Sequence, residues 1–235
     1  MSSTLNKIVQ RTRNLAWKLA DILPEGRRLS FRRFLLHRGL SKFEIEWHNI
    51  RDLGPNRGTA LDIGANRGLW SIELAQHYNQ VIAFEPNTEI TRELEKCGIA
   101  NIKVMHLGLS CAEGESVLHL PIDSNDRCLD GWASLSPNNL TECQKTSERI
   151  VSIRPLDSLG LTDVTFIKLD VEGHEIEVIK GGMKLLSRDR PIVLAEIRPA
   201  NFADFSSLMN QVGLFLLPPE GSRSEDMFLF GPLDR

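Results

Sequence analysis

The sequence predicts a doubly wound α/β fold, in which helices cover both faces of a mostly parallel β-sheet. From residue 59 onward, short β-rich runs alternate with helical stretches, a pattern typical of parallel strands joined by helices. A turn with two glycines follows the first run, and acidic residues stand at or after the ends of three others. Ligands of open α/β sheets bind beyond the carboxyl ends of the strands, so these residues also indicate where a site would lie.

The expected strands and helices follow one another from residue 60. The strands are 60–63, 81–84, 102–105, 165–169 and 192–197, with 214–217 and 227–230 forming a hairpin at the edge of the sheet. The helices between them are 69–78, 88–97, 175–186 and 203–212. Gly98 suits the end of the second helix, because glycine adopts the left-handed conformation without strain.

The interval 111–160 does not fit a simple helical crossover. Residues 116–122 and 149–156 are expected to be strands, and a polar, turn-rich stretch, Asp123–Glu148, lies between them. A loop of this length inside a compact domain is usually functional or disordered. We expect a mobile flap in which Gly131–Leu135 (GWASL) folds over the site, and a plain surface excursion is the alternative.

Residues 1–55 are predicted to form a helical extension of the main domain, residues 56–235. Apolar residues at helical spacing predict a helix from Leu5 to Leu23, which Pro24 and Gly26 end. A second short helix is expected to begin at Ser30 as its N-cap, with three apolar residues on one face. Those three are Phe31, Phe34 and Leu35, and a further apolar cluster before Gly54-Pro55 comprises Phe43, Ile45, Trp47 and Ile50.

Charge is distributed unevenly along the chain. Residues 1–40 contain nine Lys/Arg and two Asp/Glu, whereas the remainder carries a formal charge of −10. An acidic main domain argues against nucleic acid as the principal substrate. The basic, amphipathic extension fits three uses: packing on the main domain, contact with a second copy in a homodimer, or peripheral binding to an anionic membrane surface.

Composition indicates a soluble globular protein. Of 235 residues, 41% are hydrophobic and 25% charged, and no apolar run reaches the length of a membrane span. The first residues do not show the basic and then apolar pattern of a secretory signal peptide. The four cysteines form neither a C-x-x-C pair nor a zinc-binding cluster, as is usual in a reducing compartment; they are Cys97, Cys111, Cys128 and Cys143. We therefore expect a cytoplasmic protein.

The strongest local motif is Leu-Asp-Ile-Gly-Ala-Asn-Arg-Gly, residues 61–68, where a buried strand turns into a helix. Gly64 and Gly68 would let the backbone approach a ligand closely. A turn that merely needs glycine is one alternative, and the dinucleotide fingerprint G-x-G-x-x-G is another. The fingerprint does not fit, because the glycines here read G-x-x-x-G. Asp62 also suits a ligand with an ammonium group better than a pyrophosphate, which it would repel.

Glu85 ends the second strand, 21 residues after Gly64. An acid about 20 residues beyond a glycine turn accepts hydrogen bonds from ribose hydroxyls in nucleotide-binding α/β proteins. A glutamate after a strand is often only solvated. Combined with the preceding motif at this spacing, Glu85 predicts a nucleoside-containing ligand.

A third motif, Leu169–Glu175 (LDVEGHE), places three titratable side chains within five residues: Asp170, Glu172 and His174. Its strand is expected beside the first strand, so Asp170 would emerge next to the ligand. The three residues, together with Glu196 from the following strand, could deprotonate a substrate hydroxyl or bind a divalent metal, with Asp170, Glu172 and Glu196 as ligands. Alternatively, the acids favour a helix N-terminus and nothing more.

These segments resemble the FkbM family of methyltransferases over about residues 59–200. The matching stretches are DIGANRGLWS (62–71), AFEP (83–86), LGLS (107–110), GWASL (131–135), IKLDVEGHE (167–175), VIKGG (178–182) and PIVLAEI (191–197). The resemblance implies a class I, Rossmann-like methyltransferase domain with seven strands, the last of them antiparallel. It also implies S-adenosylmethionine as the cofactor. The expected cofactor-binding residues are Asp62, Gly64, Ala65, Asn66, Gly68, Glu85, Pro86 and Asp170.

The implied reaction is O-methylation of a small metabolite, sugar or glycoconjugate. The methyl sulfonium is already activated, so the enzyme must mainly position the acceptor, and Asp170, Glu172 or His174 could take its proton. Two other functions stay open. One is a catalytically inactive S-adenosylmethionine-binding or scaffold protein, and the other is a nicotinamide-dependent oxidoreductase.

Overall fold

The fold was examined in a computed structural model, which describes residues 18–38, 45–48, 50–55, 57–123, 132–136, 145–218 and 226–233. Its main sheet has seven strands in the order β3-β2-β1-β7-β8-β10-β9. Strands β3, β2, β1, β7 and β8 are parallel, and β10 runs antiparallel between β8 and β9. The predicted fold class is therefore confirmed. The strands are β1 Thr59–Ile63, β2 Gln80–Phe84, β3 Ile102–Met105, β7 Val164–Leu169, β8 Ile192–Glu196, β9 Phe215–Leu216 and β10 Met227–Gly231.

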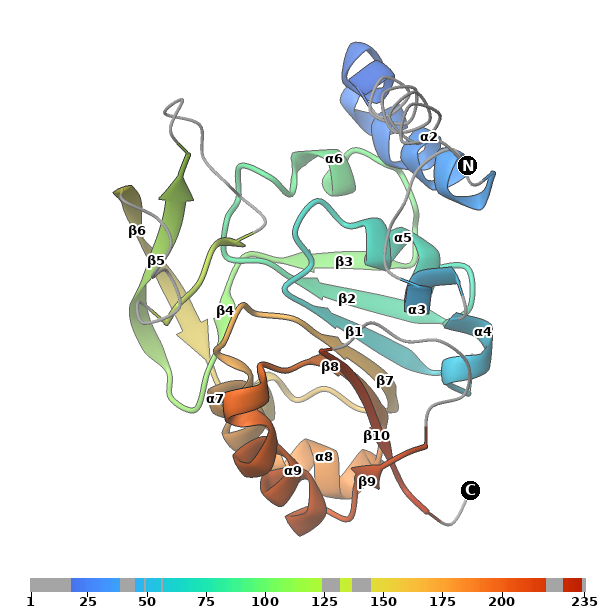
Figure 1. The fold of residues 1–235 in the computed structure, drawn as a ribbon. Helices are drawn as coiled ribbons and strands as arrows, with labels where there is room; N and C mark the ends of the chain where they lie inside the picture. Colours follow the sequence, from blue (N-terminus) through green and yellow to red (C-terminus); the bar gives the residue numbers. More distant parts are fainter. Residues whose placement is uncertain are drawn as a thin grey trace, which may run out of the picture.

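Helices cover both faces of this sheet (Figure 1). The short helices α5 (Leu69–Leu74) and α6 (Arg92–Glu95) lie on one face, and α7 (Glu175–Lys180), α8 (Met183–Asp189) and α9 (Phe202–Gln211) lie on the other. Side chains of β1 alternate between the two resulting cores, as the pleat of a strand requires. Leu61 and Ile63 pack with residues of α7–α9, whereas Ala60 packs with Trp70 of α5 and Trp47.

A second, smaller sheet stands beside the ends of the main strands (Figure 1, left). Its order is β4-β6-β5, with β4 Gly108–Leu109, β5 Gly114–Ile122 and β6 Lys145–Arg154. The strands predicted at 116–122 and 149–156 are present. However, β6 begins at Lys145, so the last residues of the predicted polar stretch, up to Glu148, belong to this strand. Of that stretch, 124–131 and 137–144 lie outside the described residues.

Three predicted helices are shorter than expected. The stretch 175–186 is divided into α7 and α8 at Gly181-Gly182. A Cβ on Gly181 would come within 2.1 Å of the Ser110 carbonyl oxygen, so close packing against the small sheet explains both the glycine and the break. The stretch 69–78 is helical only over its first part, in α5, and then forms non-helical turns. The stretch 88–97 begins with non-helical turns and is helical only in α6. Tyr78 packs against Phe166 instead of continuing α5, with ring centroids 5.5 Å apart.

Helix α2 (Glu25–His37) corrects the prediction that a helix begins at Ser30. Pro24 takes the N-cap position, where its missing N–H costs nothing, and Ser30 lies inside the helix. Gly26 lets α2 approach the chain beyond α6, because an added Cβ would lie 2.3 Å from the Lys96 carbonyl oxygen. Phe34 is about half exposed and does not share a buried face with Leu35. The buried face consists of Leu29, Arg32, Leu35 and Leu36.

Ion pairs fasten α2 to α5 and α6. Arg32 pairs with Glu93 of α6, and both side chains are almost fully buried. Arg33 lies 2.6 Å from the carboxylate of Glu73 in α5. The described part of the extension thus packs on the main domain. It further includes the 3₁₀ turn η1 (Ala20–Ile22), α3 (Ile45–His48) and α4 (Ile50–Leu53), while residues 1–17, with most of the predicted first helix, lie outside the described residues.

Two further expectations concern membranes and cysteines. Over the ranges described, no helix is long and apolar enough to cross a membrane. Cys97 and Cys111 are free thiols, while Cys128 and Cys143 fall outside those ranges.

Candidate active site

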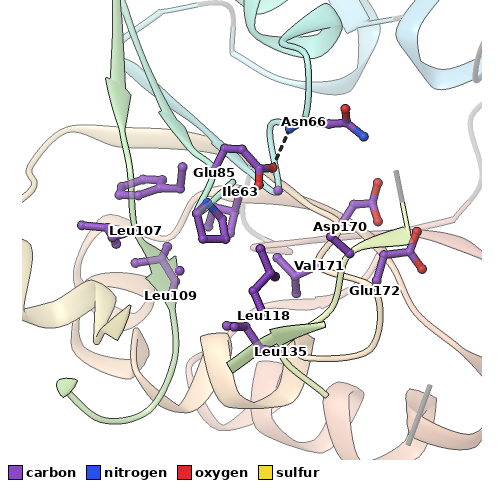
Figure 2. A pocket seen from close by; sticks show the side chains of 15 residues that line it. Ile63, Asn66, Glu85, Leu107, Leu109, Leu118, Leu135, Asp170, Val171 and Glu172 are labelled. Carbon is purple, nitrogen blue, oxygen red and sulfur yellow. Dashed lines mark hydrogen bonds between the residues drawn. The ribbon is translucent and has the colours of Figure 1, made fainter. Parts of the chain in front are cut away.

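Two adjoining pockets lie at the carboxyl ends of β1, β2 and β7. The first pocket is shown in Figure 2: leucine side chains line one side, and Asp170 and Glu172 stand on the opposite side. It is lined by Ile63, Gly64, Asn66, Phe84, Glu85, Pro86, Leu107, Gly108, Leu109, Leu118, Ala133, Leu135, Asp170, Val171 and Glu172. The second pocket is lined by Gly64, Ala65, Asn66, Arg67, Leu69, Trp70, Trp132, Lys168, Asp170, Glu172 and Glu196.

The turn after β1 separates the two pockets, and its two glycines have different roles. Gly64 has φ +79°, and a Cβ there would lie 1.8 Å from the Asp170 carbonyl oxygen, so only glycine fits between the ends of β1 and β7. Gly68 also has positive φ, but it faces Leu94 and is the N-cap of α5. It lines neither of these two pockets, and its contact with a ligand stays a prediction.

Glu85 is buried at the end of β2 and both of its carboxylate oxygens accept hydrogen bonds. The backbone N–H of Asn66 and that of Asn87 each donate to it at 2.9 Å, and the first of these bonds is drawn in Figure 2. Burial nevertheless raises the pKa of Glu85 to about 7. A carboxylate with free acceptor capacity, facing a pocket in a dry environment, favours a ligand that donates hydroxyl hydrogen bonds.

Asp62 lies behind the turn and lines neither pocket. Its Oδ2 accepts a hydrogen bond from the Ser71 hydroxyl at 2.5 Å, which ties the end of β1 to α5. Burial raises the pKa of Asp62, and within the described structure its Oδ1 has no hydrogen-bond partner. The geometry therefore favours a supporting role for Asp62, in place of the direct contact with an ammonium group that the sequence suggested.

The end of β7 contributes a buried lysine that sequence reasoning missed. Lys168 pairs in register with Asp62 of β1, and its Nζ lies 2.7 Å from the Asp170 carboxylate. Its side chain is 3% exposed, and it lines the second pocket. A charged residue within a strand covered on both faces was the signal that could have revealed it, because buried charges are rare unless paired.

Asp170 and Glu172 line both pockets, as expected for residues at their junction. Glu172 has φ +52°, a left-handed conformation that is uncommon for a glutamate. Burial and the nearby Asp170 raise the pKa of Glu172 to about 7, while the Arg198 guanidinium at 3.8 Å opposes this shift. A carboxyl with this pKa exchanges its proton readily at neutral pH.

His174 is placed away from both pockets. Its Nε2 lies 3.0 Å from the Ser110 hydroxyl and its Nδ1 lies 3.2 Å from the Ser136 hydroxyl. Burial lowers the pKa of His174, so the neutral imidazole is favoured. These contacts connect three segments of the chain and argue for a structural role. The neighbouring Glu175, which the sequence did not single out, accepts the N–H of Gly173 at 2.8 Å and so shapes the same turn.

The segment Trp132–Ser136, here called the strap, joins the two pockets. Ser134 exchanges two backbone hydrogen bonds with His119 of β5, at 2.9 and 3.0 Å, and its hydroxyl donates to the Glu172 carbonyl oxygen at 2.8 Å. Ala133 and Leu135 line the first pocket, and Trp132, 53% exposed, lines the second. The strap therefore contacts both sites and the turn that carries Glu172.

The expected metal ligands share one pocket without forming a metal site. Asp170, Glu172 and Glu196 all line the second pocket. Among the residues whose positions are described, no group of three or more His, Cys, Asp or Glu side chains is arranged to hold a metal ion.

Several solved methyltransferase structures align with this chain. A methyltransferase FkbM from Methylobacillus flagellatus KT aligns with a TM-score of 0.54 and 16% identity over 75% of this chain, but over only 44% of that chain. A TehB-like S-adenosylmethionine-dependent methyltransferase from Corynebacterium glutamicum gives a TM-score of 0.46 with 14% identity, covering 85% of this chain and 91% of that one. An S-adenosylmethionine-dependent methyltransferase from Aquifex aeolicus gives 0.45 with 13% identity, covering 80% and 89%.

Sequence comparison identifies the family. No curated protein matches the chain significantly. The sequence profile of the methyltransferase FkbM domain, however, matches residues 62–220, which is more than half of the chain. This range contains the turn after β1, Glu85, the strap and the turn that carries Glu172. The chain therefore belongs to the FkbM methyltransferase family.

Proposed function

We propose that this protein transfers a methyl group from S-adenosylmethionine to a hydroxyl group of a small molecule or saccharide. The observation that carries the proposal is the pair of adjoining pockets, which share Gly64, Asn66, Asp170 and Glu172. A methyl transferase needs a nucleoside site and an acceptor site that meet at the reacting carbon. The shared residues lie where such sites would meet.

The residues of the first pocket fit the nucleoside part of the cofactor. Glu85 supplies acceptors for the ribose hydroxyls, and Leu107, Leu109, Leu118 and Leu135 supply an apolar surface for the adenine ring. Pro86 closes the same wall beside Glu85. On the other side of the turn, Ala65 and Asn66 line the second pocket with Asp170, and we assign the methionine part of the cofactor to this junction.

The second pocket fits a hydroxylated acceptor. Trp132 offers an aromatic surface at the rim, and Glu172 and Glu196 offer hydrogen-bond acceptors inside. Aromatic faces combined with carboxylates suit a polyhydroxylated ring, which has an apolar face and hydroxyl groups at its edge. This combination is the reason for including saccharides among the acceptors.

The bound cofactor would supply an activated methyl group on a sulfonium, so the chain must orient the acceptor and remove its proton. We assign proton removal to Glu172, whose carboxylate lines both pockets. The acceptor oxygen would bond to the methyl carbon as the carbon–sulfur bond breaks and S-adenosylhomocysteine leaves, and the acceptor's proton would pass to the Glu172 carboxylate. Asp170, paired with Lys168, is the second charged group at this point and holds the acceptor in position. His174 is not assigned a catalytic role.

The first experiment measures binding of S-adenosylhomocysteine and of NAD to the full chain by calorimetry. Binding of the former alone supports the proposed cofactor, and binding of NAD alone would indicate an oxidoreductase and contradict it. Methyl-labelled S-adenosylmethionine is then supplied with a panel of saccharides and hydroxylated aromatic compounds, and products are identified by mass spectrometry. Cofactor binding without transfer to any compound, including extracts of the source organism, would favour the inactive binding protein.

A variant tests the acceptor site separately. Trp132→Ala should raise the KM for the acceptor about tenfold, because stacking on an aromatic side chain is lost. The affinity for S-adenosylhomocysteine should not change, since Trp132 lines only the second pocket. An unchanged KM together with weaker cofactor binding would place the acceptor elsewhere.

A further inference from the structure

The outer side of the N-terminal extension combines apolar and basic side chains, of which Arg27, Phe34 and Arg38 are exposed and Phe31 is partly buried. Arg27, Phe31, Phe34 and Arg38 recur at intervals of four, three and four residues, so they lie along one side of α2 and its C-cap. The rings of Phe31 and Phe34 are stacked with centroids 6.4 Å apart, and the Arg38 guanidinium lies 5.4 Å from the Phe34 ring. We call these four residues the outer stripe.

Two further exposed apolar residues lie in the segment just before α2. Ile22 of η1 is 79% exposed and Leu19 is 46% exposed, compared with 49% for Phe34. Ile22 is the most exposed large hydrophobic residue in the described part of the chain. Exposed apolar side chains that recur in one short region commonly mark an interaction surface.

The charges of this region are sorted between two sides of α2. Arg32 and Arg33 point to the main domain, where they pair with Glu93 and Glu73. The region's two acids are also paired: Asp21 with Arg32, and Glu25 with Lys96. The exposed cations of this region are Lys18, just before η1, and Arg27 and Arg38 in the outer stripe. The sequence before them, residues 1–17, adds three Lys/Arg and no acidic residue.

We propose that this outer side of the extension binds the surface of an anionic lipid bilayer, with Ile22 and Phe34 entering the headgroup region. Helices that lie in the membrane interface carry exposed apolar and aromatic side chains together with cations. Cations near an anionic surface add attraction, which the acidic remainder of the chain would not supply. Phenylalanine and arginine are also enriched at protein–protein interfaces, so a dimer contact is the alternative outcome of the test.

The arrangement of the molecule is compatible with this orientation. Helix α2 contacts α5 and α6 through its inner side, and Figure 1 shows it at the end of the molecule away from α7–α9. The inner ion pairs would hold the main domain on the bilayer while the outer stripe contacts lipid. This inference does not depend on the proposed reaction.

The test is co-sedimentation of the full chain with vesicles of phosphatidylcholine alone and of phosphatidylcholine mixed with phosphatidylserine. Binding is expected only to the mixed vesicles, and added salt should release the protein. Two double variants, Ile22→Ser/Phe34→Ser and Arg27→Gln/Arg38→Gln, should each weaken binding about tenfold or more. Matched controls are Ile150→Ser, 73% exposed on β6, and Lys103→Gln/Lys184→Gln, both exposed, which should bind as the unmodified chain does.

Several outcomes would overturn the proposal. Absence of binding to mixed vesicles would do so, as would equal loss of binding in the control variants. If the double variants instead abolished a dimer seen by light scattering and left vesicle binding unchanged, the outer side would be a protein interface. Thermal unfolding verifies that each variant is folded. The effect of salt on vesicle binding by the unmodified chain tests the proposal without any variant.

Discussion

Glu85 and Glu172 both have a pKa of about 7, and burial is the largest cause in each case. Their surroundings otherwise differ. Two backbone N–H groups hold Glu85 in one orientation, whereas Glu172 is next to Asp170 on a strained turn. The first arrangement favours binding and the second favours proton exchange. The two carboxyls can therefore be distinguished by experiment even though they titrate in the same range.

Glu172→Gln tests proton removal. A general base must be ionised, so kcat of the unmodified enzyme should rise with pH and level off above about 7. The variant should lose about 10²-fold or more in kcat and show no such rise. The measurement is kcat at saturating cofactor and acceptor across the pH range. The matched control is Glu115→Gln, which changes an exposed glutamate on β5. If kcat of Glu172→Gln still rose with pH as it does in the unmodified enzyme, Glu172 would be excluded as the base.

Glu85→Gln tests the nucleoside site. Burial raises the pKa of Glu85 from 4.5 to about 7, so its contribution to folding stability is full below about pH 4.5 and falls as pH rises toward 7. Ribose hydroxyls donate to the charged form and lower this pKa again, so S-adenosylhomocysteine should release protons when it binds near pH 7.

Calorimetry in buffers of different ionisation enthalpy measures this release. The variant should release fewer protons and bind about 1–3 kcal/mol more weakly, the range for a hydrogen bond to a charged group or an unpaired buried group. Equal affinity and equal proton release in both proteins would show that Glu85 does not contact the ligand.

Some residues that the sequence predicted for the site line the pockets, and others do not, for identifiable reasons. Glu85 and Asp170 follow strands directly, and the carboxyl end of a parallel strand fixes their position. Gly68 and His174 lie one turn further on, where packing against Leu94, Ser110 and Ser136 decides which way they face. Those partners are distant in sequence, so no local pattern reveals them.

Among the structural elements, the strap is the one that links the two pockets. The Ser134 hydroxyl both donates to the Glu172 carbonyl oxygen and accepts the Ser136 N–H at 3.0 Å. Ser134 is 1% exposed, so loss of the hydroxyl would leave two buried polar groups without this partner. The predicted mobile flap remains a prediction for the stretch around it, and Ser134 is the point at which it can be tested.

Ser134→Ala should reduce stability by about 1–3 kcal/mol, the cost of leaving buried groups unpaired. The amides of 132–136 should also exchange hydrogen faster in the variant, and S-adenosylhomocysteine should slow exchange in the unmodified chain. Hydrogen exchange with and without the ligand measures both effects. Ser158→Ala, which removes an exposed hydroxyl bonded to Pro155, is the control. Equal protection with and without ligand would argue against a flap.

Strands were predicted more accurately than helices, again for a physical reason. The central strands β1, β7 and β8 are mostly apolar and buried on both faces, so composition indicates them. Helix ends depend on contacts with other segments. The stretch 175–186 has helical composition on both sides of Gly181-Gly182, and the approach of Gly181 to the Ser110 carbonyl divides it there. Strand β4, two residues long, is formed only by pairing with β6.

At the scale of the whole molecule, Glu93 connects the N-terminal extension to the turn after β1. Arg32 of α2 pairs with its Oε2, and Arg28 and Arg67 lie 3.4 and 3.6 Å from its Oε1. Arg67 belongs to the turn after β1 that lines the second pocket. One carboxylate thus joins α2, α6 and the turn. We infer that the extension and the main domain unfold as a single unit.

Arg32→Met tests this connection. Removing one partner of a buried ion pair leaves the other charge without its main compensation, so stability should fall by about 3 kcal/mol and the melting temperature by roughly 6–12 °C. Arg27→Met, on the exposed side of the same helix, should change stability by less than about 0.5 kcal/mol. Adding Glu93→Gln to Arg32→Met should recover part of the loss, because the buried negative charge is then removed.

Denaturant unfolding followed by both circular dichroism and tryptophan fluorescence gives the measurement. A separate early transition in the single variant would show that α2 undocks independently, and an unchanged melting temperature would show that the ion pair contributes nothing to docking.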